Sequence, residues 1–390
     1  MLSVSPFKYG STVSGKTFTG RKDECKKLTH NLLSGVHTTI ISPRRWGKSS
    51  LVEKVVRDIV KQDKSIKVVL LDLFTVSNEQ DFLEMFAREV IKASSSKLGG
   101  RISAVKTFFK QISPKVTLGV DPNTDFSIGF DWNEAKKHKD EILDLPEELA
   151  KKKNIRLIVC LDEFQNITNF EHYEELEKAM RAAWQRHKHV SYCLYGSKRH
   201  MMEDLFRKSS KPFYRFGDIM FLEKIPKTDW IKFIIKGFKD TGKSIPKKLA
   251  DFIPLMMENH PWYVQQFASY TWRLTENEVT ANEIAEAMKE LIRTNLPLYQ
   301  NEVEDLSAKQ VNLLKAIFDG EEQLTSTRVM QRYDLGTPIN IIRNKKSLEK
   351  NDMIYKTNGK KYDFLDPAFK LWFMLQYYGK DASDISNIPS

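Results

Sequence analysis

The features that mark secreted and membrane proteins are scarce in this sequence. Its 390 residues include only three cysteines, Cys25, Cys160 and Cys193, and no two of them form a CxxC pair. Two of the three lie in apolar runs, so we expect buried, reduced thiols. No apolar run approaches the roughly 20 residues of a membrane-spanning helix, and the first residues lack the apolar centre of a signal peptide. These absences predict a cytoplasmic protein with no membrane partner.

The composition is that of a folded, basic protein. Hydrophobic residues make up 41% of the chain and charged residues 29%, which is ordinary for a globular protein. The length allows two or three domains of about 150 residues each. A net charge of +11 permits a polyanionic partner but does not require one.

Residues 38–52, TTIISPRRWGKSSLV, carry the most informative motif. An apolar β-branched run, a turn, Gly47-Lys48-Ser49 and an amphipathic segment follow in the order strand, loop, helix. In a P-loop of this kind, backbone N–H groups and a helix N-terminus bind phosphate. We expect Lys48 to reach the β- and γ-phosphates of ATP and Ser49 to ligate Mg²⁺. The predicted nucleotide-binding loop comprises Ser42, Pro43, Arg44, Arg45, Trp46, Gly47, Lys48, Ser49 and Ser50.

The loop departs from the pattern G-x-x-x-x-G-K-[ST] at one position. Ser42 stands where the pattern has glycine, and Pro43 stiffens the start of the loop. Serine fits there if its φ is negative, because glycine is required only where φ is positive. A chance Gly-Lys-Ser at a strand–helix junction is the alternative interpretation.

A second motif ends a buried strand. Residues 155–161, IRLIVCL, are almost wholly apolar, as in a strand buried on both faces, and Asp162-Glu163 follow directly. This is the Walker B pattern. We expect Asp162 to hold Mg²⁺ through its water shell and Glu163 to orient or activate the attacking water. Acidic residues often end strands, but the two motifs together predict an ATPase.

Further segments predict an α/β core around these motifs. We expect helices at 50–61, 79–95, 133–152 and 173–187, strands at 67–74, 189–195 and 218–222, and a β-hairpin from strands at 115–120 and 126–130. Ser197 follows one strand and is a candidate sensor of the γ-phosphate; it could instead cap the next helix. Arg215 could approach the γ-phosphate in its own or a neighbouring subunit, or form a surface salt bridge.

Two segments outside the motifs could contact the nucleotide. Phe18, Gly20 and Arg21 precede a helix that runs to residue 33, a position that often borders adenine, although a simple helix start capped by Thr19 explains it too. Residues 226–301 read as helical throughout, which predicts a lid. His260 and Pro261 begin one of its helices, with proline in the first turn.

Residues 307–373 predict a winged helix-turn-helix. Helices at 308–318, 326–333 and 339–351 precede a hairpin at 354–364. Basic residues lie on the third helix and the wing, where phosphate contacts to double-stranded DNA are made. A winged helix that binds protein is the alternative. The candidate DNA contacts are Arg343, Lys345, Lys346, Lys360 and Lys361.

Taken together, seven segments resemble a prokaryotic and archaeal ATPase family of the P-loop AAA+/STAND group. They are FTGRKDE at 18–24, SPRRWGKSS at 42–50, LIVCLDEFQNI at 157–167, YGS at 195–197, KPFYR at 211–215, HPWYVQ at 260–265 and DPAFKLWF at 366–373. The resemblance implies an ASCE-type parallel sheet, a helical lid and a C-terminal winged helix, with ATP and Mg²⁺ as ligands.

The domain organisation predicted on this basis has four parts. A P-loop core at 1–225 carries the hairpin insertion at about 99–132, and a lid at 226–301, a winged helix at 302–375 and a tail at 376–390 follow. The predicted function is an Mg²⁺-dependent ATPase whose nucleotide state switches the winged helix. The alternative is a signalling switch or adaptor with little hydrolysis whose winged helix binds an unknown protein. A kinase would use the same loop, but the lid and winged helix argue against it.

Overall fold

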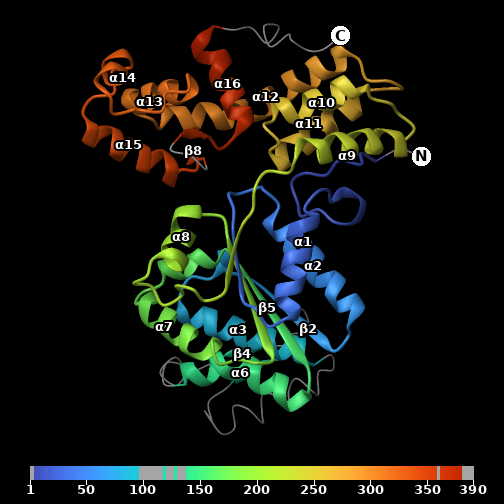
Figure 1. Ribbon diagram of the computed structural model, residues 1–390, viewed down its shortest axis with the longest axis vertical. Helices are drawn as coiled ribbons and strands as arrows, with labels where there is room; N and C mark the ends of the chain where they lie inside the picture. Colours follow the sequence, from blue (N-terminus) through green and yellow to red (C-terminus); the bar gives the residue numbers. More distant parts are fainter. Residues whose placement is uncertain (1–3, 96–116, 120–126, 130–137, 358–360, 380–390) are drawn as a thin grey trace. The chain divides into compact units, whose positions relative to one another are not determined.

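The computed structural model describes residues 4–95, 117–119, 127–129, 138–357 and 361–379 (Figure 1). The chain divides into two compact units. Arg21–Glu223 form the first, called the sheet unit below. Met1–Gly20 and Lys224–Ser390 together form the second, called the helical unit.

A five-stranded parallel sheet organises the sheet unit, which confirms the predicted fold class. Its strands are β1 Thr38–Ile41, β2 Ile66–Asp72, β5 Arg156–Asp162, β6 Val190–Gly196 and β7 Asp218–Phe221. They lie in the order β2-β5-β6-β1-β7. Because all strands are parallel, the residues that follow them gather at one edge of the sheet.

Helices cover the two faces of this sheet and make a three-layer arrangement. Alternate strand residues such as Val69, Leu71 and Val159 share a core with α3, α6 and α7. Helices α1 and α2 also pack on the sheet, but their residues are not part of this core (Figure 1). The helices of the unit are α1 Lys22–Leu33, α2 Lys48–Gln62, α3 Glu79–Ser94, α6 Lys139–Lys153, α7 Tyr173–Trp184 and α8 Arg199–Arg207.

Two local features refine the sequence-based boundaries. The strand expected at 67–74 ends at Asp72, because the Asp72 carboxylate accepts a hydrogen bond of 2.9 Å from the Phe74 N–H and starts a short turn. In the region of the predicted hairpin, β3 Thr117–Gly119 pairs antiparallel with β4 Ser127–Gly129. The turn expected at 121–124 lies outside the described residues.

The helical unit has one continuous hydrophobic core. That core joins the four helices of the predicted lid to the three helices and hairpin of the winged helix. Asp366 caps the last helix by accepting hydrogen bonds from the Ala368 and Phe369 N–H groups. The elements are α9 Lys227–Asp240, α10 Lys247–Met256, α11 Pro261–Leu274, α12 Ala281–Glu304, α13 Ala308–Phe318, α14 Thr327–Arg332, α15 Pro338–Lys350, β8 Ile354–Lys356, β9 Tyr362–Phe364 and α16 Pro367–Tyr378.

The first residues of the chain belong to this helical core and not to the sheet. Phe7 is only 3% exposed, and its ring lies 5.7 Å from that of Phe233 and 5.5 Å from that of Phe238. The Lys8 N–H donates to the Gln265 amide oxygen at 2.9 Å. The first residues, placed in the P-loop core on the basis of the sequence, are therefore packed with residues from Lys224 onwards.

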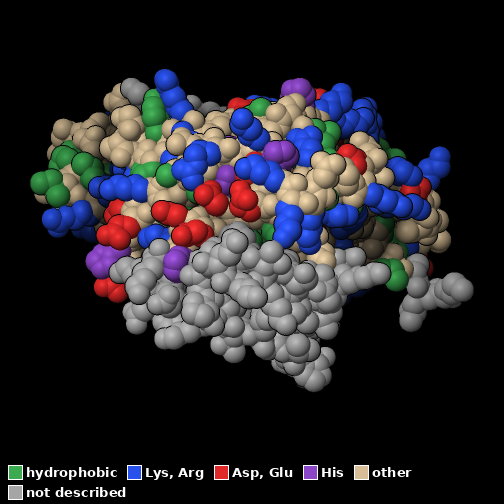
Figure 2. All heavy atoms as spheres, turned by 90° about the horizontal axis from the view of Figure 1, so that it is seen from below, with side chains coloured by type: hydrophobic (Ala, Val, Ile, Leu, Met, Phe, Trp, Pro, Cys, Tyr) green, Lys and Arg blue, Asp and Glu red, His purple; other side chains and the backbone are tan. Residues whose placement is uncertain are grey.

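The helices, the charged surface and the thiols bear on the sequence-based expectations about membranes and cysteines. Among the described residues, no helix combines the length and apolar character needed to cross a membrane. On the face drawn in Figure 2, Lys and Arg side chains are spread among Asp, Glu and His side chains. Cys160 and Cys193 are buried and Cys25 is half-buried; all three are free thiols, as the sequence predicted.

Candidate active site

The loop between β1 and α2 has the backbone that a phosphate-binding loop requires. Gly47 precedes the first residue of α2 with a φ of 90°, and Arg45 has a φ of 64°. Ser42 is not among the residues with positive φ, so serine satisfies the condition set for it from the sequence. Its hydroxyl donates to the Pro43 carbonyl at 3.0 Å.

The N-terminus of α2 faces the same edge of the sheet as the ends of the strands. Gly47 has no side chain with which to cap this helix, so the N–H groups of the first turn are available to an anion. The helix dipole adds partial positive charge at the same place. The loop is therefore suited to bind phosphate oxygens.

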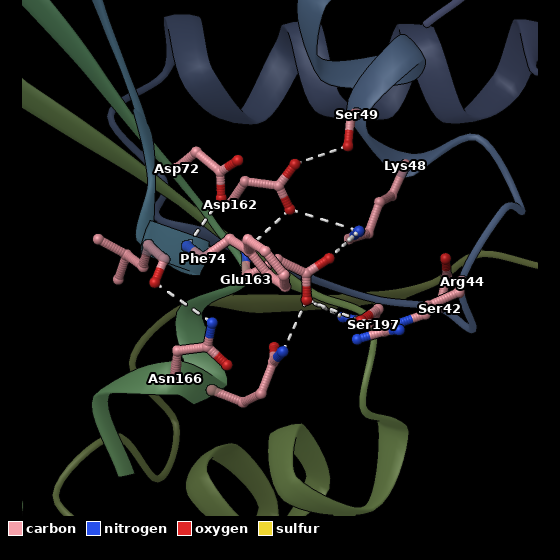
Figure 3. A network of polar contacts seen from close by, with 12 residues as sticks. Ser42, Arg44, Lys48, Ser49, Asp72, Phe74, Asp162, Glu163, Asn166 and Ser197 are labelled. Atoms are coloured by element: carbon pink, nitrogen blue, oxygen red, sulfur yellow. Dashed lines mark hydrogen bonds and ion pairs between the residues drawn. The ribbon is translucent and has the colours of Figure 1, made fainter. Parts of the chain in front are cut away.

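Direct contacts join the loop to the end of β5 (Figure 3). The Lys48 ammonium lies 2.7 Å from Glu163 Oε1 and 3.4 Å from Asp162 Oδ1. The Ser49 hydroxyl donates to Asp162 Oδ2 at 2.6 Å. The side chains of Lys48, Asp162 and Glu163 are 10%, 17% and 16% exposed, so these contacts are largely shielded from water.

Glu163 has a strained backbone and a heavily hydrogen-bonded carboxylate. Its φ of 50° turns the chain sharply as β5 ends. Burial by itself would raise the pKa of Glu163, but the charge of Lys48 and hydrogen bonds from Lys48, Gln165 and Ser197 outweigh it and lower this pKa to about 2. The carboxylate is therefore ionised at neutral pH.

Asp162 and Ser49 supply the donor types that Mg²⁺ prefers. Burial raises the pKa of Asp162, against the opposing effects of Lys48 and Ser49. A hydroxyl and a carboxylate 2.6 Å apart at a phosphate-binding loop fit a Mg²⁺ ion that keeps water and phosphate ligands. Among the described residues, no group of three or more His, Cys, Asp or Glu side chains forms a separate metal cage.

Three other predicted residues lie around this network. The Ser197 hydroxyl donates to Glu163 Oε2 at 2.7 Å, and the Arg44 guanidinium lies 3.4 Å from that hydroxyl. Arg21, expected near adenine, is 4% exposed and donates to the Trp46 carbonyl at 2.9 Å. Arg21 thus holds the backbone of the loop just before Gly47.

Arg215 is not brought together with these residues. It precedes β7, whose first residue Asp218 lies beside Thr38, the first residue of β1. Phe216 stacks on His37 at 4.5 Å, just before β1. Arg215 therefore lies near the edge where the strands begin, whereas the loop follows the end of β1.

Other predicted contacts lie in the helical unit. Phe18, Gly20, His260 and Pro261 all belong to it and not to the unit that carries the loop. In the winged helix, the Lys345 ammonium lies 5.0 Å from the centre of the Tyr362 ring, and Lys360 lies outside the described residues.

Two residues that the sequence did not single out lie at the site. The Gln165 amide donates to Glu163 Oε2 at 2.6 Å. Asp72 ends β2 in register with Asp162 on the neighbouring strand. An acidic residue at the end of a second buried strand was a usable signal for Asp72, whereas no periodicity marks Gln165.

Comparisons with known proteins agree with this geometry. Residues 46–225 match the KAP family P-loop domain, and residues 297–375 match the family described as "Probable winged helix domain". This chain has a P-loop NTPase fold. The P-loop domain and the winged helix are thus supported by family matches as well as by their topology.

Solved structures resemble the chain over most of its length. A Walker-type ATPase of Pyrococcus abyssi is 18% identical, with a TM-score of 0.64 over 94% of this chain and 99% of that one. The ORC2 protein of Aeropyrum pernix, in its ADPNP and ADP complexes, is 14% identical, with a TM-score of 0.54 over 92% of this chain and 95% of that one. At these identities the likeness is one of fold. No curated protein matches the chain.

Proposed function

We propose that this protein is an Mg²⁺-dependent ATPase whose nucleotide state switches the helical unit. The observation that carries the proposal is the direct contact of the loop residues Lys48 and Ser49 with Glu163 and Asp162. The same four side chains have complementary tasks in ATP hydrolysis. The P-loop fold and the nucleotide complexes of the ORC2 protein support it.

The residues of the Lys48–Glu163 ion pair take new partners when ATP binds. Lys48 leaves Glu163 for the β- and γ-phosphates, while the N–H groups at the start of α2 bind phosphate oxygens. Ser49 and Asp162 would hold Mg²⁺, which would neutralise charge on the phosphates. Ser197 stays close enough to Glu163 to report on the γ-phosphate.

Of the two carboxylates at the end of β5, Glu163 is then the one left to act on water. The water oxygen bonds to the γ-phosphorus, the bond from that phosphorus to the β–γ bridging oxygen breaks, and ADP and phosphate leave. Glu163 orients the water and accepts its proton, which is released to solvent. The hydrogen bonds from Gln165 and Ser197 also lower its pKa, and they still favour the ionised form after Lys48 has moved.

ATP turnover of the purified protein tests this function. We expect Lys48→Ala to abolish nucleotide binding or turnover, and Glu163→Gln to bind ATP normally while hydrolysing it at least 100-fold more slowly, as when a group acting in the transition state is lost. Normal turnover by Lys48→Ala would remove the P-loop assignment. Normal turnover by Glu163→Gln would remove its role as base.

We further propose that the winged helix binds double-stranded DNA. Five basic residues of α15 and the wing form no ion pair or ring contact within the part of the chain that the structure describes, which leaves them available to phosphates. They are Arg343, Lys346, Lys350, Lys356 and Lys361. We expect DNA affinity to fall steeply with salt and to weaken in an Arg343→Glu/Lys346→Glu variant. An unchanged affinity would show that the module binds something else.

The second candidate is a switch with little hydrolysis whose winged helix binds protein. Ile339 and Ile342 favour it, because they lie one turn apart on α15 and are 63% and 47% exposed. Turnover measured with and without duplex DNA, at low and physiological salt, separates the two candidates. Stimulation by DNA supports the first, and slow turnover indifferent to DNA supports the second.

Several finer assignments belong to the same proposal. We propose that Phe18, Gly20, His260 and Pro261 contribute to adenine binding, and that residues 226–301 act as the lid. We propose that Arg215, which lies at the edge where the strands begin, acts across a subunit interface and not in its own subunit. Membership of the STAND group rests on the sequence resemblance, since the family matched over residues 46–225 is the KAP family.

A further inference from the structure

Gln165 is a buried polar residue that contacts the carboxylate proposed to act on water. It lies two residues after Glu163, in a short helical turn, Phe164–Asn169. Gln165 is 1% exposed, and its amide nitrogen donates to Glu163 Oε2 at 2.6 Å. Its amide oxygen is buried with no hydrogen-bond partner among the described residues. A buried amide in this state is costly, which points to a task for its hydrogen bond to Glu163.

The two oxygens of Glu163 have different surroundings (Figure 3). Oε2 accepts three hydrogen bonds, at 2.6 Å from the Gln165 amide, 2.7 Å from the Ser197 hydroxyl and 3.2 Å from the Ser197 N–H. Oε1 contacts the Lys48 ammonium at 2.7 Å. When Lys48 moves to the phosphates, Oε2 keeps its three donors and Oε1 loses its partner.

The neighbouring strand leaves room for this glutamine. Gly196 ends β6 directly before Ser197, and a Cβ atom there would lie 2.0 Å from the Gln165 amide oxygen. The left-handed turn at Glu163 brings the chain back so that residue 165 can reach residue 163. The missing side chain at Gly196 and the turn at Glu163 together allow the Gln165 amide to reach Oε2.

We propose that Gln165 is a positioning residue that anchors Glu163 through Oε2, so that Oε1 is the oxygen that faces the reacting water. This role rests on the proposed ATPase function. Gln165 does not touch the nucleotide in this scheme, and it acts only through the orientation of Glu163. Loss of Gln165 leaves Ser197 as the remaining donor to Oε2 among the described residues, so the carboxylate is held less firmly. Small misplacements of a reacting group cost up to about 100-fold in rate.

The test compares Gln165→Met with a matched change at the next residue. Methionine has a similar length and lacks the donor. Asn166 lies in the same turn; its side-chain amide donates to the Leu73 carbonyl at 3.2 Å, and only its backbone N–H, which a substitution keeps, bonds to the Glu163 carbonyl among the described contacts. We expect Gln165→Met to lower kcat for ATP at least tenfold, with KM and the Kd for a fluorescent ADP analogue within twofold of wild type. We expect Asn166→Leu to leave kcat within threefold.

Thermal unfolding separates positioning from damage to the fold. We expect Gln165→Met and Asn166→Leu to shift Tm by similar amounts. We expect Gln165→Asn, whose shorter amide cannot reach Oε2, to lower kcat as much as Gln165→Met does. Suppose that wild type turns over ATP but Gln165→Met keeps kcat within twofold, or loses no more kcat than Asn166→Leu. The positioning role of Gln165 is then overturned, while the proposed ATPase function stands. If wild type binds the ADP analogue but hydrolyses no ATP, the proposed ATPase function is overturned, and this role with it.

Discussion

We predict that the ion pair between Lys48 and Glu163 contributes measurably to the free energy of unfolding when no nucleotide is added. Lys48→Met removes the cation that lies 2.7 Å from Glu163 and 3.4 Å from Asp162. All three side chains are less than a fifth exposed, so two carboxylates remain in a poorly solvated site without a counter-charge. Breaking a buried pair in this way costs about 3–5 kcal/mol, and the residual exposure places our expectation near the lower value, about 3 kcal/mol.

A double-mutant cycle isolates the pair from other effects of the substitution. Glu163→Gln removes one of the two carboxylates that Lys48→Met would leave unpaired, so the double variant should be less destabilised than the sum of the single ones. We expect a coupling of about 2 kcal/mol, within the range seen for residues in contact. Urea unfolding without nucleotide, followed for the transition of the sheet unit, measures all four proteins.

Another lysine of the same helix is the control. Lys54 forms an exposed pair with Asp58 at 2.7 Å on α2, and such a pair contributes about 0.3–0.5 kcal/mol. Lys54→Met should therefore cost far less than Lys48→Met. Equal costs, or a coupling near zero in the cycle, would show that the Lys48 contacts do not stabilise the nucleotide-free site and would refute the reasoning.

Two more predictions concern pH and the N-terminal segment. Burial lowers the pKa of His37 from 6.5 to about 4, so the unfolded chain binds this proton more readily and stability is lost as pH falls from about 6.5 towards 4. In urea unfolding at several pH values, His37→Gln should flatten this slope; equal slopes in wild type and His37→Gln would contradict the assignment. Phe7→Ala should destabilise the helical unit by about 3 kcal/mol, as large-to-small changes in a core do, and should leave the transition of the sheet unit unchanged. A calorimetric shift of the sheet unit instead would show that Phe7 packs elsewhere.

The sequence predicted the α/β core because its signals are local. Buried parallel strands read as apolar runs, and the strand expected at 155–161 is found as Arg156–Asp162. The helix expected at 308–318 is found as Ala308–Phe318. Two motifs at the ends of parallel strands must meet at one edge of the sheet, and the structure brings Lys48 and Glu163 together there.

The features that escaped prediction depend on contacts between distant segments. Gln165 has its role because Gly196 leaves space for it, and no pattern within either segment shows this. Arg21 contacts the Trp46 carbonyl across 25 residues of sequence. Arg215 was predictable in part, because a residue just before a parallel strand lies at the edge where strands begin, away from a loop that follows one.

The packing of Phe7 against α9 has a consequence for the order in which the chain folds during synthesis. The partners of residues 4–20 are made more than 200 residues later, which at 5–20 residues per second is a delay of roughly 10–40 s. The sheet unit is continuous in sequence and can fold in this interval. Arg21 and Glu223, its first and last residues, interact electrostatically, so its folding brings the two flanking segments close together. Closing the long loop between Phe7 and α9 would otherwise cost roughly 5 kcal/mol, and a folded sheet unit removes most of that cost before the helical unit assembles.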